Sequence, residues 1–324
     1  MRRILSIDGG GIRGTFPAAF LAALEEDLEH PIGSYFDLIA GTSTGGIIAI
    51  ALAMGIPARE VAELYEKHGP EIFAQNKKGL SAWLSKWHRT TKWAVWGPKY
   101  ETSSLRQALE GVLGNRRIGE AKTRLMVPSW NGRAKKVYVY KTAHNSRLTT
   151  DYKDPAIDAA LATSAAPTYF REYITANDVG LVDGGLWANN PTGFAVIEAT
   201  SVLGWPSDQL RVLSVSCLED IFEMKQAYSA RSIVEKTADF FMAGQSHGSM
   251  GIAHLITGDP HERKAIWRIC QPVPDGFFSI DNTKKIQELK ARGFTEARIQ
   301  KPILKPHFFT EPAAPFVPFH KLEG

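Results

Sequence analysis

The sequence predicts an α/β fold in three layers, with helices covering both faces of a mostly parallel central sheet. Short, branched apolar segments alternate with amphipathic helical segments, and the loops between them are short. The chain has 324 residues, of which 44% are apolar and 22% charged, so it can bury a sizeable core. No internal repeat or low-complexity linker is visible, and we therefore expect residues 1–324 to form a single domain.

The first strand and helix units lie at the N-terminus. Residues 3–7 have the branching of a buried strand, and an amphipathic helix is expected from Pro17 to Glu29, with the proline in its first turn. A second strand is expected over residues 36–40, followed by a helix from Gly45 to Met54. A third helix is expected from Pro57 to about His68.

The rest of the chain continues this alternation. Strands are expected at residues 124–127, 136–141, 181–182, 210–216 and 265–269. Helices are expected at residues 103–113, 155–162, 191–203, 229–242 and 282–300. Residues 302–324 are expected to form a C-terminal strap, because residues 302–318 are rich in proline and aromatic side chains.

Bulk properties exclude several classes of function. The net charge of +4 is too small to predict a nucleic acid partner. The two cysteines, Cys217 and Cys270, lack C-x-x-C spacing, so we expect no disulfide framework, no metal site and no other cofactor. The apolar stretch near the N-terminus ends at Asp8, and no apolar run is long enough to cross a bilayer. We expect a cytoplasmic protein that contacts the inner face of the membrane peripherally.

A serine framed by glycines is the strongest local motif. In Gly41-Thr42-Ser43-Thr44-Gly45, the serine lies between a short apolar strand and a helix. On such a turn its hydroxyl stands clear of the backbone near the positive end of the helix, which suits attack on a carbonyl carbon. The motif alone also fits a structural turn whose serine caps the next helix.

A glycine-rich loop, Asp8 to Gly14, follows the first strand. Its backbone amides can turn inward, and those of Gly10 and Gly11, with that of Thr44, are suited to form an oxyanion hole beside Ser43. The loop also contains G-x-G-x-x-G, which makes a dinucleotide-binding oxidoreductase an alternative. That fingerprint needs an acidic residue at the end of the second strand, whereas Asp37 lies at its beginning.

Arg13 in this loop has two possible roles. It can place a positive charge near the site, or it can order the loop through a structural ion pair, and the sequence leaves both open.

A nucleophilic serine also needs a base, and the sequence offers nine histidines and Asp183. His247 and His254 lie in a helix-rich region without a recognisable turn. Asp183 ends a strand and is followed by Gly184 and Gly185, so it lies on an open turn where its carboxylate can approach another loop. A plain turn is the alternative reading.

Four segments, in this order, resemble the sequence blocks of patatin-like phospholipases: Asp8–Gly14, Gly41–Gly45, Ala162–Pro167 and Asp183–Gly185. The resemblance covers about residues 1–200. It implies a patatin-like fold and a lipid acyl hydrolase of the phospholipase A type, which cleaves fatty acyl esters of membrane phospholipids through an acyl-enzyme. A catalytically inactive nucleotide-sensing protein on the same fold is a further alternative, but it would be expected to lack one member of the catalytic pair.

The resemblance also assigns roles to residues. It implies that Ser43 is the nucleophile and Asp183 the base of a dyad without histidine. It further implies that Gly9, Gly10 and Gly11 form the oxyanion loop. The supporting glycines are Gly41, Gly45, Gly184 and Gly185. Because an ordinary aspartate has a pKa of about 3.9 and is a weak base, burial is expected to raise the pKa of Asp183.

The chain resembles the bacterial members of the family, several of which are effectors of cyclic-oligonucleotide antiphage signalling. This resemblance implies a cyclic nucleotide as an activator. A free phospholipase would endanger its own cell, which makes gating physically reasonable. Residues after about 200 carry no motif and are the candidate location of a regulatory pocket or of a homo-oligomer surface.

A tryptophan-rich segment is expected to act as a cap or membrane-contacting insertion over residues 77–100. It contains Trp83, Trp87, Trp93 and Trp96 interleaved with basic side chains. Indole rings and cations together suit a membrane interface. A packed insertion with these tryptophans in its core is the alternative.

Overall fold

A computed structural model describes residues 1–73, 99–221, 230–258, 261, 263–274 and 276–322 of the protein, with backbone only for 230–239. Its centre is an eight-stranded sheet in the order β5-β6-β3-β2-β1-β7-β9, with β4 pairing to β3. The strands are β1 (Arg2–Ile7), β2 (Leu38–Gly41), β3 (Arg124–Asn131), β4 (Lys136–Lys141), β5 (Tyr173–Ile174), β6 (Gly180–Asp183), β7 (Leu210–Val215) and β9 (Ile266–Ile269). The five strands from β3 to β9 are parallel, while β4, β5 and β6 run antiparallel to their neighbours.

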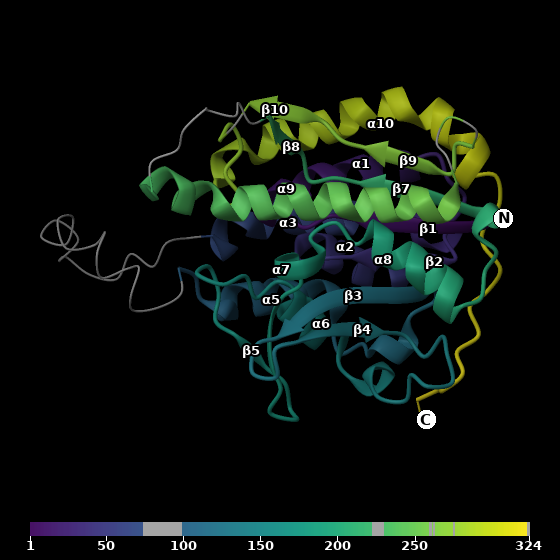
Figure 1. Ribbon diagram of the computed structural model, residues 1–324, viewed down its shortest axis with the longest axis horizontal. Helices are drawn as coiled ribbons and strands as arrows, with labels where there is room; N and C mark the ends of the chain where they lie inside the picture. Colours follow the sequence, from purple (N-terminus) through teal and green to yellow (C-terminus); the bar gives the residue numbers. More distant parts are fainter. Residues whose placement is uncertain (74–98, 222–229, 259–260, 262, 275, 323–324) are drawn as a thin grey trace, which may run out of the picture.

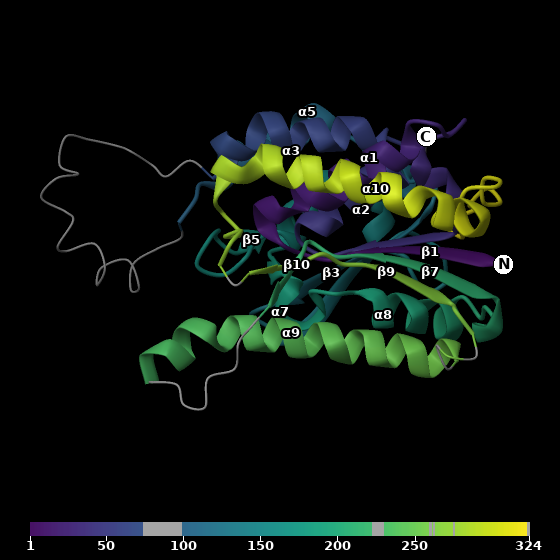
Figure 2. The same ribbon diagram turned by 90° about the horizontal axis from the view of Figure 1, so that it is seen from above.

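Helices cover both faces of the sheet (Figure 2). On one face lie α1 (Thr15–Glu25), α2 (Thr44–Ala53), α3 (Ala58–Ile72), α5 (Thr102–Leu113) and α10 (Ile286–Phe308), with α6 (Ala156–Thr163) packed against α2 and α5. On the other face lie α7 (Gly185–Ala188), α8 (Thr192–Ile197) and the long α9 (Ala230–Thr257). The predicted three-layer fold with a mostly parallel sheet is confirmed.

Two buried apolar clusters correspond to the two faces of the sheet. The larger includes Phe16 and Phe20 of α1 and Ile48 of α2, and the smaller includes Val196 of α8 and Ala253 of α9. Burial on both faces explains why the parallel strands consist of nearly continuous apolar residues.

A small second sheet lies near the upper edge of the molecule in Figure 1. Its strands β8 (Glu219–Ile221) and β10 (Pro272–Pro274) pair in parallel. Between β10 and α10 the chain passes the glycine-rich loop of the N-terminus, whose residues Gly11–Gly14 form the 3-10 helix η1.

Some expected boundaries are wrong. Residues 302–308, expected in the strap, continue α10 and contain Pro302 and Pro306. Each proline removes one helical hydrogen bond, but Leu304 and Phe308 are fully buried on the helix, and this burial offsets the loss. The helix expected to end at residue 242 extends to Thr257. The helix expected over 191–203 is α8 followed by a π-helix, Glu198–Val202.

Beyond α10 the chain follows the surface without regular structure. The amide of Ala313 donates to the carbonyl of Ser34, and that of Phe319 to the carbonyl of Ala143. Most of the expected insertion, residues 77–98, lies outside the described residues. Its four tryptophans are among them: Trp83, Trp87, Trp93 and Trp96.

Candidate active site

Ser43 lies on a strained turn between β2 and α2. Its φ of 55° and ψ of −126° are a conformation that residues with a side chain seldom adopt. The turn is tight, because a Cβ on Gly41 would lie 2.1 Å from the carbonyl oxygen of Gly45. The Ser43 amide donates to the Thr163 hydroxyl oxygen at 2.9 Å, and this hydroxyl donates to the carbonyl of Pro128 at 2.6 Å. The backbone of the serine is therefore held by Thr163, the last residue of α6.

Asp183 is the last residue of β6, paired in register with Ser129 of β3. Its amide donates to the carbonyl of Ala165 at 3.0 Å, and its Oδ1 accepts from the amide of Gly185 at 2.7 Å. The structure brings this carboxylate close to Ser43, whose side chain lowers the pKa of Asp183. Ser43 is 9% exposed and Asp183 4%. The two residues thus form a contact pair shielded from solvent.

The environment of Asp183 makes it a stronger base than an ordinary aspartate. Burial raises its pKa to about 6, and the hydrogen bonds from Ser43 and Gly185 lower it in part. The direction of this shift agrees with the upward shift that was expected from the sequence. The side chains and amides that shift the pKa of Asp183 are those of Ser43 and Gly185, and no histidine is among them. His144 bonds Glu198 and Thr142, and His247 pairs with Glu219.

The glycine-rich loop lies directly against the serine, since a Cβ on Gly9 would be 3.0 Å from Ser43 Cβ. The amides of Gly9 and Gly10 are engaged, by the Asn189 carbonyl at 3.0 Å and by the Thr44 hydroxyl at 3.2 Å. The Gly10 amide, which was expected to be a donor of the oxyanion hole, is therefore not free, and neither is the amide of Gly9 in the expected oxyanion loop. The amides of Gly11 and Thr44 hydrogen-bond nothing within the described part of the chain. These two are the donors available for an oxyanion.

Arg13 orders the loop. Its guanidinium forms an ion pair with Asp220 at 2.7 Å, and its Nε donates to the carbonyl of Phe278, also at 2.7 Å. The amide of Ile12 donates to the carbonyl of Ile280 at 2.8 Å. Of the two roles that the sequence left open for Arg13, these contacts favour the structural one.

A second buried ion pair holds the start of the loop and was missed by the sequence analysis. Both oxygens of Asp8 accept from the guanidinium of Arg268 on β9, which also donates to the Ser214 hydroxyl at 2.8 Å. Burial raises the pKa of Asp8, and Arg268 lowers it in part. An arginine inside the apolar segment of residues 265–269 was the available signal, since a charge in a buried strand needs a partner.

Thr163 and Asn189 were likewise not assigned roles from the sequence. Thr163 supports the Ser43 amide, and the Asn189 carbonyl accepts the Gly9 amide. Thr163 lies in the Ala162–Pro167 segment of the family resemblance, which was the available signal, whereas Asn189 belongs to none of the four segments.

In the described ranges, no three His, Cys, Asp or Glu side chains come together in a way that could hold a metal ion. No helix among the same residues combines the length and the apolar character needed to cross a bilayer.

Comparison with known proteins identifies relatives of this chain. A family model described as patatin-like phospholipase matches residues 5–196. A cGAMP-activated phospholipase of Pseudomonas aeruginosa (strain BWHPSA011 / Pa011) is 36% identical over 220 residues, which cover 66% of this chain and 62% of the relative. One from Escherichia coli (strain TW11681) is 40% identical over 205 residues, covering 60% of this chain and 55% of the relative. The chain thus spans little more than half of the length of these relatives.

Among solved structures, VipD from Legionella pneumophila is 12% identical with a TM-score of 0.48, covering 95% of this chain and 67% of that one.

Proposed function

This chain belongs to the patatin-like phospholipase family, and from that premise we propose that it hydrolyses fatty acyl esters of membrane phospholipids. The observation that carries the proposal is the proximity of the Ser43 side chain to the buried carboxylate of Asp183, whose pKa the serine lowers. Nucleophile and base are in contact, as acyl transfer requires. In the described part of the chain, no histidine is among the groups that shift the pKa of Asp183, so the carboxylate is the candidate base.

In the first half of the proposed reaction, Ser43 Oγ bonds to the acyl carbonyl carbon while its proton passes to the Asp183 carboxylate. The carbonyl oxygen becomes an oxyanion, which the amides of Gly11 and Thr44 stabilise, each by about 2.7 to 4 kcal/mol. The bond to the alcohol oxygen then breaks. That oxygen takes the proton from Asp183 and leaves as the lysophospholipid, with the acyl group on Ser43.

In the second half, water replaces the alcohol. Its oxygen bonds to the acyl carbon and its proton passes to Asp183. The ester bond to Ser43 breaks, Ser43 Oγ takes the proton back, and the fatty acid leaves. A pKa of about 6 suits both halves, because Asp183 is ionised near neutral pH and still binds a proton readily.

The alternative of a dinucleotide-binding oxidoreductase is not favoured. Asp37 precedes β2, at the opposite end of the strand from Ser43, and its carboxylate accepts from the amide of Arg3 and the guanidinium of Arg2. It is therefore unable to bind a ribose beside the glycine-rich loop. The presence of both Ser43 and Asp183 also argues against a catalytically inactive protein.

A cyclic nucleotide is the proposed activator, and a peripheral contact with the membrane is the proposed mode of access to lipid. Support for the activator comes from relatives that are named cGAMP-activated phospholipases and are 36% and 40% identical to this chain.

The test is covalent labelling with a fluorophosphonate, followed by mass spectrometry. We expect one adduct, on Ser43, which Ser43→Ala abolishes and the exposed-site control Ser103→Ala retains. Asp183→Asn should lower ester turnover by about 10³-fold or more, because the serine then lacks its base. Labelling that persists in Ser43→Ala contradicts the assignment, as does a histidine substitution that alone abolishes turnover.

A further inference from the structure

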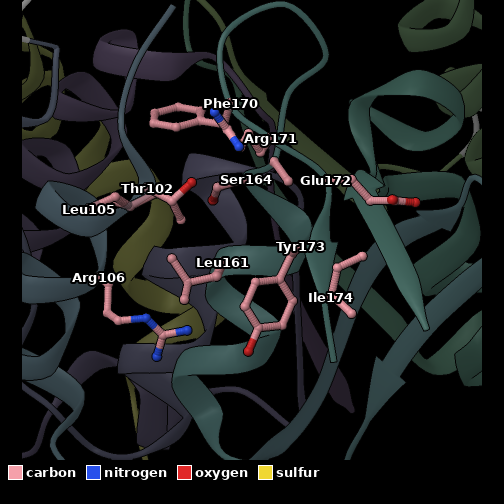
Figure 3. A pocket seen from close by; sticks show the side chains of 11 residues that line it. Thr102, Leu105, Arg106, Leu161, Ser164, Phe170, Arg171, Glu172, Tyr173 and Ile174 are labelled. Atoms are coloured by element: carbon pink, nitrogen blue, oxygen red, sulfur yellow. The ribbon is translucent and has the colours of Figure 1, made fainter. Parts of the chain in front are cut away.

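The pocket between α5, α6 and the segment that leads into β5 does not bring its charged groups together (Figure 3). It has a volume of about 290 Å³, and the guanidinium groups of Arg106 and Arg171 lie at opposite ends of it. One small ligand that contacts both groups is therefore not indicated. A clearer contact surface lies on α9, the long outer helix on the other face of the sheet (Figure 2).

The inward face of α9 is fixed to the body of the molecule. Gln245 accepts from the amide of Asn190 at 3.1 Å and donates to its carbonyl at 3.2 Å. The buried hydroxyl of Ser249 donates to the same carbonyl at 2.7 Å and accepts from the amide of Gly193 at 2.9 Å. Ala253 is fully buried in the smaller apolar cluster. These contacts fix the direction in which the opposite face of the helix points.

The outward face of α9 carries apolar side chains and glycines. We call six exposed residues of this face the outer stripe: Phe241, Gly244, Gly248, Gly251, Ile252 and Leu255. Phe241 is 74% exposed and Leu255 87%. A Cβ on any of the three glycines would meet no atom of the described chain within 4 Å. Glycine destabilises a helix relative to alanine, and no packing within the described residues explains its use at these three positions.

The outer stripe is also free of charge. Residues 240–257 contain no Asp, Glu, Lys or Arg, whereas a surface helix usually carries charged side chains on its solvent face. His247 lies beside the stripe and pairs with Glu219 of β8 at 3.5 Å. When one surface meets an identical copy of itself, any net charge on it repels. An uncharged stripe therefore suits a contact between two copies of this chain.

The order of side chains along the stripe is symmetrical about Gly248. Phe241 and Leu255 lie seven residues on either side of it, and Gly244 and Ile252 lie four residues on either side. If two copies pack antiparallel about a two-fold axis at Gly248, Phe241 of each copy faces Leu255 of the other, and Ile252 faces Gly244. Glycine at the crossing point lets the two backbones approach closely, and the large side chains fill the space where the helices diverge.

We infer that the outer stripe of α9 is the contact surface of a homodimer, in which the two helices cross antiparallel at Gly248. Antiparallel packing needs this mirror order of side chains, whereas parallel packing does not. A membrane surface fits the stripe less well. Helices that lie on membranes combine a large apolar face with basic side chains, while the middle of this stripe consists of glycines and the helix segment has no Lys or Arg.

The size of the stripe sets the expected strength of the dimer. An 18-residue helix segment is about 27 Å long and about 10 Å across, so the helix pair covers roughly 300 Å² on each copy. A standard stable interface buries about 800 Å² on each partner. We therefore expect a reversible dimer with a Kd in the micromolar range. This self-association does not depend on the proposed function.

Sedimentation velocity of the full chain, from low micromolar to several hundred micromolar concentration, tests the dimer. Gly248→Leu should raise its Kd about tenfold or more, because the new side chain separates the backbones at the crossing point. Leucine favours a helix and has open space here, so the monomer should remain folded, as circular dichroism checks. Gly111→Leu, at an exposed glycine of α5 with equally open space, is the matched control and should dimerise as the wild type does.

Cross-linking tests the orientation of the two helices. A short bismaleimide should join Phe241→Cys to Leu255→Cys in an equimolar mixture of the two variants, and should join neither variant to itself. In the antiparallel pair, the two copies of residue 241 lie about 21 Å apart along the helices. The wild type with the same reagent measures any background from the partly exposed Cys270.

Three results would overturn the inference. They are a chain that stays monomeric at every concentration, a dimer that Gly248→Leu leaves unchanged, and cross-linking of Phe241→Cys to itself at the yield of the mixture. Flotation with vesicles of phosphatidylethanolamine and phosphatidylglycerol covers the other occupant. If Gly248→Leu alters vesicle binding of a chain that remains monomeric, the stripe contacts lipid and the homodimer is wrong.

Discussion

At the scale of single residues, the proposed role of Asp183 as a base opposes the stability of the fold. Its carboxylate is buried, and its pKa of about 6 lies above the ordinary value of about 3.9. The folded protein thus binds the proton more tightly than the unfolded chain does. This contribution to stability is full below pH 4 and is lost as the pH rises through about 6. At neutral pH the fold holds an ionised group in a place that favours a neutral one.

Asp183→Asn should therefore stabilise the protein at pH 8 while it inactivates the enzyme. A difference of about two pKa units corresponds to about 3 kcal/mol, which is the upper limit of the gain. The asparagine keeps an acceptor for the Gly185 amide and carries no charge. Urea unfolding at pH 8 and pH 4 measures the effect, which should be largest at pH 8 and small at pH 4.

The exposed Asp178 supplies the matched control, because Asp178→Asn removes a carboxylate without relieving any burial. It should change the free energy of unfolding little at either pH. A loss of stability in Asp183→Asn at pH 8, or an equal change at both pH values, would show that desolvation of the carboxylate does not dominate.

At the scale of elements, the oxyanion loop depends on a clamp formed by distant segments. The small sheet of β8 and β10 positions Asp220 against Arg13, and the segment that follows β10 supplies the carbonyls of Phe278 and Ile280. The side chains of Arg13 and Asp220 are 14% and 11% exposed, so their ion pair is only weakly screened by solvent.

Asp220→Asn should loosen the loop and lower kcat about tenfold with little change in KM. The neutral side chain leaves the Arg13 guanidinium buried without a counter-charge, which should also reduce the free energy of unfolding by about 1 to 3 kcal/mol. Steady-state kinetics on a soluble ester and urea unfolding are the measurements. Glu63→Gln, which disrupts exposed ion pairs with Arg59 and Lys67, should leave both unchanged. A kcat equal to that of the wild type would show that the ion pair between Arg13 and Asp220 does not support catalysis.

Elements set by local pattern could be predicted from the sequence, whereas those set by distant contacts could not. The turn at Ser43 could be predicted because Gly41 and Gly45 flank the serine in the sequence. Strand β1 could be predicted from the apolar, branched residues within it. The continuation of α10 through Pro302 depends on packing against α1, and the role of Arg268 depends on Asp8, 260 positions earlier in the chain. The partners of Arg13 lie more than 200 residues away, so the sequence left its role open.

At the scale of the whole molecule, the candidate site is assembled from most of the chain. The oxyanion loop follows β1, Ser43 follows β2, Thr163 ends α6, Asp183 ends β6, and Arg268 belongs to β9. The two apolar clusters pack against the same central sheet, one on each face. The candidate site therefore draws on segments from both ends of the described chain.

Unfolding should therefore be a single transition, as a single domain over residues 1–324 requires. Urea titrations followed by far-ultraviolet circular dichroism, by tryptophan fluorescence and by fluorophosphonate labelling of Ser43 should share one midpoint, because the sheet, its two cores and the dyad are lost together. Labelling that disappears at lower urea than the circular dichroism signal would mean that the site opens locally while the sheet remains folded. Two separate transitions in the dichroism itself would mean that the chain contains more than one cooperative unit, and the single-domain proposal would then be wrong.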